Sequence, residues 1–172
     1  MSPLEDLGTF LLHAVVLEDE AASRYDELAD TMEVHHNDEV AALFRQMASF
    51  SRLHLNEARQ HAADHAGGLP DLKPWEFDWP GAESPETGRT EAAHYLMTPH
   101  HALKLALAAE ESAHNFYASV AERAGTAEIR ELAAEFATEE AEHAAELREW
   151  LTRYPPPPPA WDEDLDPPAA VD

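Results

Sequence analysis

The sequence has 172 residues, of which 44% are hydrophobic, enough for one domain with a substantial core. It contains no cysteine, which excludes disulfides, iron–sulfur clusters, thiolate zinc sites and cysteine nucleophiles. The formal charge of −24 would repel a phosphate backbone and attract cations, so nucleic acid is not an expected partner. No apolar run approaches the roughly 20 residues that cross a membrane, and the start of the chain lacks the basic pattern of a secretory signal. We therefore expect a cytoplasmic protein without membrane contact.

Two long helices are predicted in the first third of the chain. Ser2-Pro3-Leu4-Glu5 has the pattern of a helix start, with a capping serine, an early proline and a glutamate three residues after the cap. A second helix is expected from near Asn37 to Gly67-Gly68. The small and apolar residues that recur every three or four positions on these helices are Leu11, Ala14, Ala21, Tyr25, Leu28 and Met32, then Val40, Leu43, Met47, Ala58 and Ala62.

Two further helices are predicted after residue 97. Thr98-Pro99 has the pattern of a helix start, Gly125 that of a helix end, and Thr126 that of the next cap. The expected core faces hold Leu103, Ala106, Ala113, Tyr117 and Val120, then Ile129, Ala133, Phe136, Leu147 and Trp150. Together the four segments predict an all-α, ferritin-like four-helix bundle with a long crossover between helices two and three.

The segments outside the helices have a different composition. Residues 67–98 are rich in proline, glycine and aromatic residues, which predicts an ordered but irregular crossover. Its three largest aromatic side chains are expected to pack on the bundle; they are Trp75, Phe77 and Trp79. Five prolines follow Tyr154 and exclude a helix there. We therefore divide the chain into a bundle at 1–154 and a Pro-rich acidic tail at 155–172, which Trp161 could anchor.

The chain contains an internal repeat. The segments EDEAASRY (18–25) and EESAHNFY (110–117) both have Glu, then Ala three residues later and Tyr seven residues later. Helices two and four also match each other when His54 is aligned with His143. The chain therefore has the pattern of two copies of one helical hairpin. On the core faces of these hairpins lie the polar residues Glu18, His54, Glu110, Glu140 and His143.

Carboxylates on a core face need an explanation. An ionised carboxylate without a partner in an apolar core costs several kcal/mol, and three close together also repel one another. Bound cations remove both costs, and oxygen ligands with imidazole suit iron, manganese or zinc. Glu140 and His143 lie three residues apart on one helix face, so Glu140 can bridge two ions while His143 binds one. A partly solvated polar seam without metal is the alternative.

Over roughly residues 4–153 the chain resembles the rubrerythrin family of the ferritin-like superfamily. The segments that carry the resemblance are EDEAASRY, LHLNEA, AEESAHNFY and EEAEHAAEL. It implies a non-haem site for two iron ions, with manganese or zinc as alternatives. The ligands that it implies are Glu18 and Glu110 as terminal carboxylates, Glu140 as a bridging carboxylate, and His54 and His143 as imidazoles. Tyr25 and Tyr117 match tyrosines that form hydrogen bonds around such sites and would assist the reaction.

The chain departs from the family pattern in the second helix. Ser51 stands where the pattern has a glutamate three residues before the histidine, so one bridging carboxylate is missing. Glu57, one turn after His54, is a candidate replacement ligand; a solvated glutamate paired with an arginine is the alternative. Two histidines are further candidates. His61 is either a surface residue or a ligand, and His114 is either a ligand or a hydrogen-bond donor to the site.

The resemblance implies an oxidoreductase that reduces peroxide or dioxygen. A rubredoxin module is absent from this sequence, so turnover would need an external electron donor. Iron binding or ferroxidase activity without turnover is one alternative, and a metal-poor helical interaction module is another. The crossover aromatics and the tail offer surfaces for a homodimer.

Overall fold

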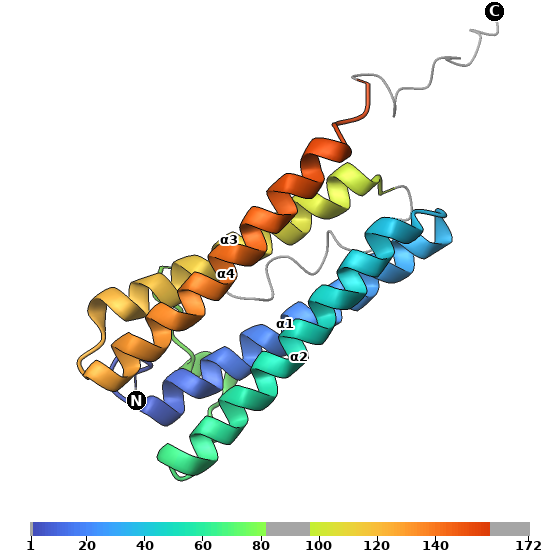
Figure 1. The fold of residues 1–172 in the computed structure, drawn as a ribbon. Coiled ribbons are helices and arrows are strands. Elements are labelled where there is room, and N and C mark those ends of the chain that lie inside the picture. Colours follow the sequence, from blue (N-terminus) through green and yellow to red (C-terminus); the bar gives the residue numbers. More distant parts are fainter. Residues whose placement is uncertain (1, 82–96, 159–172) are drawn as a thin grey trace, which may run out of the picture.

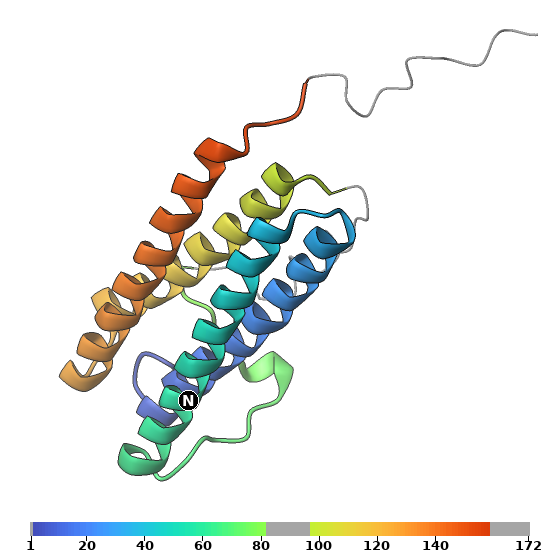
Figure 2. The same ribbon diagram turned by 45° about the vertical axis from the view of Figure 1, so that its right-hand side comes forward.

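The computed structural model describes residues 2–81 and 97–158. These residues form the helices α1 (Leu7–Val34), α2 (Asp38–His65), α3 (Pro99–Arg123) and α4 (Ala127–Arg153), with a short 3-10 helix, η1 (Pro74–Glu76), after α2. α1 packs against α2 and α3 against α4, which gives two hairpins side by side (Figures 1 and 2). The predicted all-α bundle with a crossover between the second and third helices is confirmed.

The predicted start of the first helix is wrong. The helix begins at Leu7, because the Asp6 carboxylate accepts hydrogen bonds from both the backbone N–H of Thr9 (2.8 Å) and its hydroxyl (2.7 Å). Ser2 instead heads a separate turn, in which its hydroxyl accepts the Leu4 N–H at 3.1 Å. A carboxylate that accepts two hydrogen bonds is a stronger cap than the serine hydroxyl.

The other helix ends follow the sequence more closely. Thr98 and Thr126 cap α3 and α4, and each side chain accepts a backbone N–H three residues further on. α2 begins directly after Asn37. Its last turn closes through the backbone bond from the Gly68 N–H to the Ala62 carbonyl (2.9 Å), with Gly68 at a φ of +106° that favours glycine.

The core of the bundle consists of two apolar clusters, one toward each end. One cluster takes its helical residues from the second half of α1, the first halves of α2 and α3, and the last part of α4. The other takes them from the opposite halves of the same helices. Between the two clusters lies a polar layer, formed by Glu18, Ser51, Glu110 and Glu140, all of which are buried.

The described part of the crossover is held on α1 and α3. Phe77 and Trp79 pack against the rings of His13 and Phe116, as predicted. His13 is fully buried; its Nδ1 donates to the Thr9 carbonyl (2.7 Å) and its Nε2 accepts the backbone N–H of Asp78 (3.1 Å). Two backbone contacts therefore fix one imidazole under the crossover.

The prediction for Trp75 is wrong, because its side chain is 80% exposed. Residues 77 and 79 follow η1 and share one side of the chain, toward the bundle, whereas Trp75 lies within the η1 turn and faces solvent. Residues 155–158 continue from α4 without helical structure, and the rest of the tail, with Trp161, lies outside the described residues. Within the described ranges, no helix has the length and apolarity needed to span a bilayer.

Candidate metal centre

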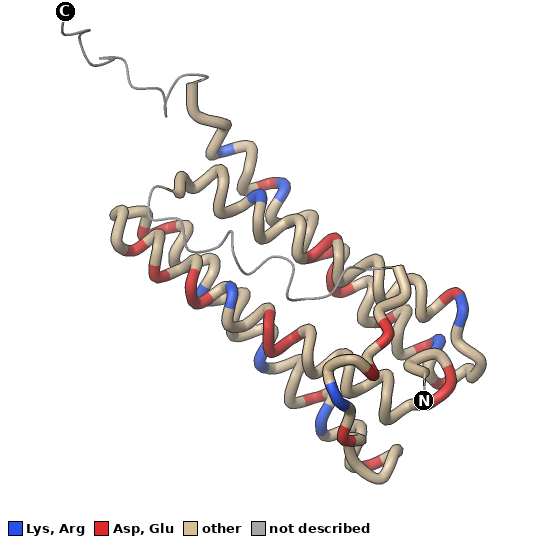
Figure 3. Tube along the Cα trace, turned by 180° about the vertical axis from the view of Figure 1, so that it is seen from behind, with Lys and Arg blue, Asp and Glu red and all other residues tan. Residues whose placement is uncertain are grey.

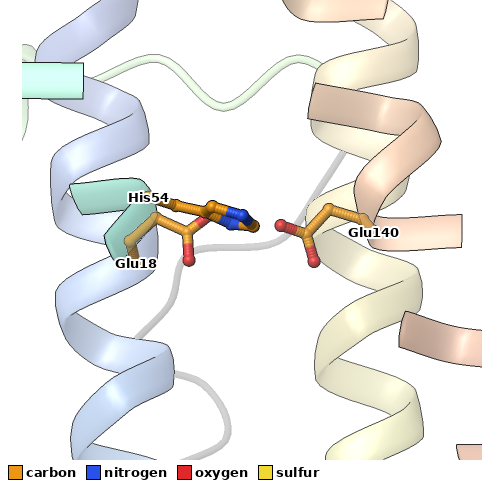
Figure 4. A group of neighbouring side chains, drawn as sticks. All are labelled: Glu18, His54 and Glu140. Carbon is orange, nitrogen blue, oxygen red and sulfur yellow. The ribbon is translucent and has the colours of Figure 1, made fainter. Parts of the chain in front are cut away.

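Three buried carboxylates from three helices meet in the polar layer. Glu18 on α1, Glu110 on α3 and Glu140 on α4 are 7%, 5% and 4% exposed. His54 on α2 and His143 on α4 lie beside them and are half-buried. Figure 4 shows Glu18 and His54 of one hairpin pointing toward Glu140 of the other. The residues that the repeat placed on core faces are therefore brought together between the hairpins.

The polar side chains form two groups that could each hold a metal ion. One group is Glu18, His54 and Glu140, and the other is Glu110, Glu140 and His143; within each, the ligand atoms lie within 4.8 Å of one another. Glu140 belongs to both groups. Two ligand atoms that are each about 2.1 Å from one ion lie about 3 to 4.2 Å apart, so this spacing suits shared cations.

The individual distances agree with that spacing. His143 Nδ1 lies 3.6 Å from Glu140 Oε2 and 3.7 Å from Glu110 Oε2. His54 Nδ1 lies 3.8 Å from Glu18 Oε1. These separations exceed a good hydrogen bond, so the imidazoles face the carboxylates across small gaps.

The three acids cannot all carry a charge without help. Burial, together with the charge of Glu110, raises the pKa of Glu18 to about 8 and also raises the pKa of Glu140. Burial opposes ionisation of Glu110 as well, but its contacts with Glu140, His143 and Tyr25 outweigh burial and lower its pKa. Glu140 contacts both other acids and is the natural place for a shared proton, or for a cation in its stead.

Two buried polar atoms at this layer lack hydrogen-bond partners among the described residues. They are Nδ1 of His54 and the hydroxyl of Tyr117. A buried polar atom without a partner is uncommon, and such an atom beside a cluster of acids is typical of a ligand site. The residues present therefore fit a divalent metal ion, with the imidazole lone pair available as a further ligand.

The two tyrosines of the repeat behave differently. The hydroxyl of Tyr25 donates a hydrogen bond to Glu110 Oε1, which joins α1 to α3. The hydroxyl of Tyr117 has no such acceptor within the part of the chain that the structure describes, although the charges of Glu18 and Glu140 act on it. Burial raises the pKa of both tyrosines well above the ordinary value, so both stay protonated donors.

The positions of Ser51, where the carboxylate is missing, and of Glu57, its candidate replacement, are both clear. Ser51 is buried in the polar layer but belongs to neither metal group. Glu57 is exposed on α2 and is likewise absent from both groups, so its place as a ligand stays a prediction. Its charge nevertheless acts on His54, one turn away.

The two further histidine candidates face other groups. His114 Nδ1 lies 2.8 Å from the carbonyl oxygen of Ala137 and therefore donates to the backbone of α4. His61 Nε2 lies 3.9 Å from Glu128, away from the polar layer. Neither histidine belongs to the two metal groups.

Glu139 was not found from the sequence. Its carboxylate oxygen Oε2 lies 3.4 Å from His54 Nε2, on the side of the ring opposite to Glu18. The side chain is 33% exposed, and burial with the nearby charges of Glu135 and Glu57 raises its pKa. The sequence held no signal for it, because Glu139 lies one position off the apolar stripe of α4, where an acid is typical of a solvated face.

The chain is similar to known proteins. The family model described as rubrerythrin matches residues 9–93 and 101–159. A solved structure, of an uncharacterized conserved protein from Magnetospirillum magnetotacticum MS-1, is similar with a TM-score of 0.71 and 44% sequence identity. That similarity covers 87% of this chain and 95% of the other. No curated protein matches the sequence.

Proposed function

The chain belongs to the rubrerythrin family, and from this premise we propose that it is a di-metal carboxylate protein that binds two iron ions and reduces peroxide or dioxygen. Manganese and zinc suit the same oxygen and imidazole ligands. The observation that supports this proposal is that Glu140 belongs to both ligand groups, so that one carboxylate is shared between them. A bridging carboxylate is what a pair of adjacent ions requires.

In this proposal each residue of the layer has a role. Glu18 and His54 would hold one ion, Glu110 and His143 would hold the other, and Glu140 would serve both. Bound iron would supply the electrons for reduction of the oxygen substrate. The Tyr117 hydroxyl, which has no partner among the described residues, donates a hydrogen bond to that substrate. The apolar clusters on either side exclude water from the layer.

The remaining partners belong to the same proposal. The electron donor is a separate reductant, because the chain has no cysteine with which to build an iron–thiolate centre. We place the protein in the cytoplasm and expect it to act as a homodimer.

An anaerobic iron titration tests the proposal. The purified protein is loaded with Fe(II), the bound ions are counted, and peroxide or dioxygen is added with and without a supplied reductant. We expect two ions per chain and repeated turnover in the presence of reductant. Glu140→Ala should abolish binding of the pair, whereas Glu142→Ala, an exposed acid two residues further along α4, should leave both ions bound.

Iron handling without turnover is the second candidate function. The charge of −24 supports it, because a strongly acidic surface concentrates cations near the site. Figure 3 shows acidic residues along both hairpins. Oxidation of two ions that then stops, even with excess reductant, would favour iron handling. A wild-type chain that binds no metal would favour the interaction module.

A further inference from the structure

The two hairpins place different residues beside equivalent histidines. Alignment of His54 with His143 puts Ser51 on Glu140 and Phe50 on Glu139. In the structure, the Phe50 ring stacks on His143 at 6.0 Å between centroids with an interplanar angle of 7°. Glu139, the residue aligned with Phe50, lies beside His54, with its carboxylate oxygen Oε2 3.4 Å from Nε2 of that ring. One imidazole is therefore flanked by an aromatic ring and the other by an acid.

The position of Glu139 bears on which nitrogen of His54 can bind metal. A neutral imidazole carries one N–H and one lone pair, and the acceptor of the N–H determines which nitrogen keeps the lone pair. His54 Nδ1 is buried, faces Glu18 and has no hydrogen-bond partner among the described residues. Nε2 lies 3.4 Å from Glu139 Oε2, somewhat longer than a good hydrogen bond, so the N–H of this nitrogen would point toward the carboxylate.

We propose that Glu139 replaces the carboxylate missing at Ser51, by accepting the N–H of His54 Nε2 and so presenting Nδ1 to the metal. Glu139 is then a positioning residue that acts through His54. The inference rests on the proposed di-metal function and deepens it. A carboxylate that accepts from a ligand imidazole fixes its tautomer and raises its basicity, and loss of such a partner typically weakens metal binding 10- to 100-fold.

The charges of the layer support the same role. Ionised Glu18, Glu110 and Glu140 carry three negative charges against the four positive charges of two divalent ions, and Ser51 adds none. Glu139 supplies the fourth charge at the His54 side, where the sequence repeat lacks its acid. The replacement thus comes from α4, across the gap between the hairpins, and not from α2.

The first experiment needs no metal. Protein with ¹⁵N-labelled histidine is studied by long-range ¹H–¹⁵N NMR in chelator-treated buffer, with His54→Asn identifying the His54 signals. We expect the Nε2–H tautomer in the wild-type chain and a mixture of tautomers in Glu139→Ala. A wild-type His54 protonated on Nδ1 alone would overturn the proposal.

The second experiment measures metal affinity by Zn(II) competition with a chromogenic chelator. Glu139→Ala should weaken the binding of one of the two ions 10- to 100-fold. The affinity of Glu139→Gln, which keeps an acceptor oxygen, should lie between those of Glu139→Ala and the wild type. Glu135→Gln and Glu142→Gln remove one exposed charge each on the same helix and should change affinity less than about twofold. Equal losses in Glu139→Gln and Glu135→Gln would overturn the proposal, because only net charge would then matter.

A double-mutant cycle addresses the replacement itself. Ser51→Glu restores the family's acid, so Glu139→Ala should cost less affinity in that background than in the wild type. An equal loss of affinity in the two backgrounds would overturn the proposal that Glu139 replaces the missing carboxylate. Should Ser51→Glu fail to fold, the comparison of Glu139→Ala with Glu135→Gln decides alone. A wild-type chain that binds neither Fe(II) nor Zn(II) would contradict the proposed function, while the tautomer measurement would still decide the contact between Glu139 and His54.

Discussion

Tyr25 and Tyr117 occupy equivalent places in the repeat but have different surroundings. The hydroxyl of Tyr25 donates a hydrogen bond to Glu110 and so satisfies an acceptor oxygen of a buried carboxylate. The hydroxyl of Tyr117 is buried among the same acids without a partner in the described part of the chain. A hydroxyl in that state costs stability, so its presence in the layer calls for an explanation, and a role in binding is the one we assign. We therefore assign the two tyrosines different tasks.

Paired substitutions test this assignment. Tyr25→Phe leaves an oxygen of Glu110 without its donor, so we expect a loss of about 1 to 3 kcal/mol in the unfolding free energy of the metal-free protein. Tyr117→Phe removes a hydroxyl without a partner, so stability should stay the same or rise. The same variant should bind iron normally yet react with peroxide about 10²-fold more slowly in stopped-flow absorbance, as for loss of one preorganised donor. Equal effects of the two variants on stability would contradict the assignment.

At the level of the elements, the sequence predicts a helix better than it predicts where the helix begins. Thr98 and Thr126 were identified because each stands directly before a periodic apolar pattern, and both are caps. Ser2 met the same criteria, but Asp6 offers a carboxylate that Thr9 satisfies twice. A cap is chosen by competition between neighbouring residues, which the pattern alone does not weigh.

The site was predictable to the extent that it follows helix periodicity. Glu18, Glu110 and Glu140 were found because each interrupts an apolar stripe, and the structure buries all three. Glu139 lies one position off that stripe and has the pattern of a solvated acid. Its contact with His54 depends on how the two hairpins face each other, which is a tertiary property.

The packing of the crossover against α3 can be tested at Gly81. Gly81 has a φ of +73°, and a Cβ there would lie 2.8 Å from Ser119 Cβ and 2.9 Å from the Asn115 carbonyl oxygen. Gly67 has the same φ but nothing within 4 Å of the added atom. Gly67→Ala should cost about 1 to 2 kcal/mol through φ alone, and Gly81→Ala should cost at least about 1 kcal/mol more, as measured by urea unfolding. Equal losses would mean that the crossover does not lie against α3.

For the whole molecule, the buried acids link stability, protons and metal. The polar layer separates two apolar clusters, so each negative charge added there without a counter-ion destabilises the bundle. A proton or a cation removes that cost. The stability of the metal-free protein should therefore depend on pH more steeply than the stability of the metal-bound protein.

The sign of this dependence follows from the pKa shifts. The folded pKa values of Glu18 (about 8), Glu140 and His143 are all raised, so between about pH 6.5 and 8 the folded metal-free state binds more protons than the unfolded state. Stability must therefore fall as pH rises through this window, by up to about 1.4 kcal/mol per pH unit for each such proton. The lowered pKa of His54 acts in the opposite direction only below about pH 6.5.

Thermal unfolding of chelator-treated protein checks the dependence. We expect Tm to fall from pH 6.5 to 8, and the gain in Tm on adding Zn(II) to grow over the same range, because the metal no longer competes with protons for the carboxylates. Glu18→Gln removes one of the acids and should flatten the metal-free curve, whereas Glu20→Gln, a glutamate on the same helix outside both metal groups, should not. A metal-free Tm that is constant or rises across this window would show that the acids are not forced together, since only their mutual burial makes the proton stabilising.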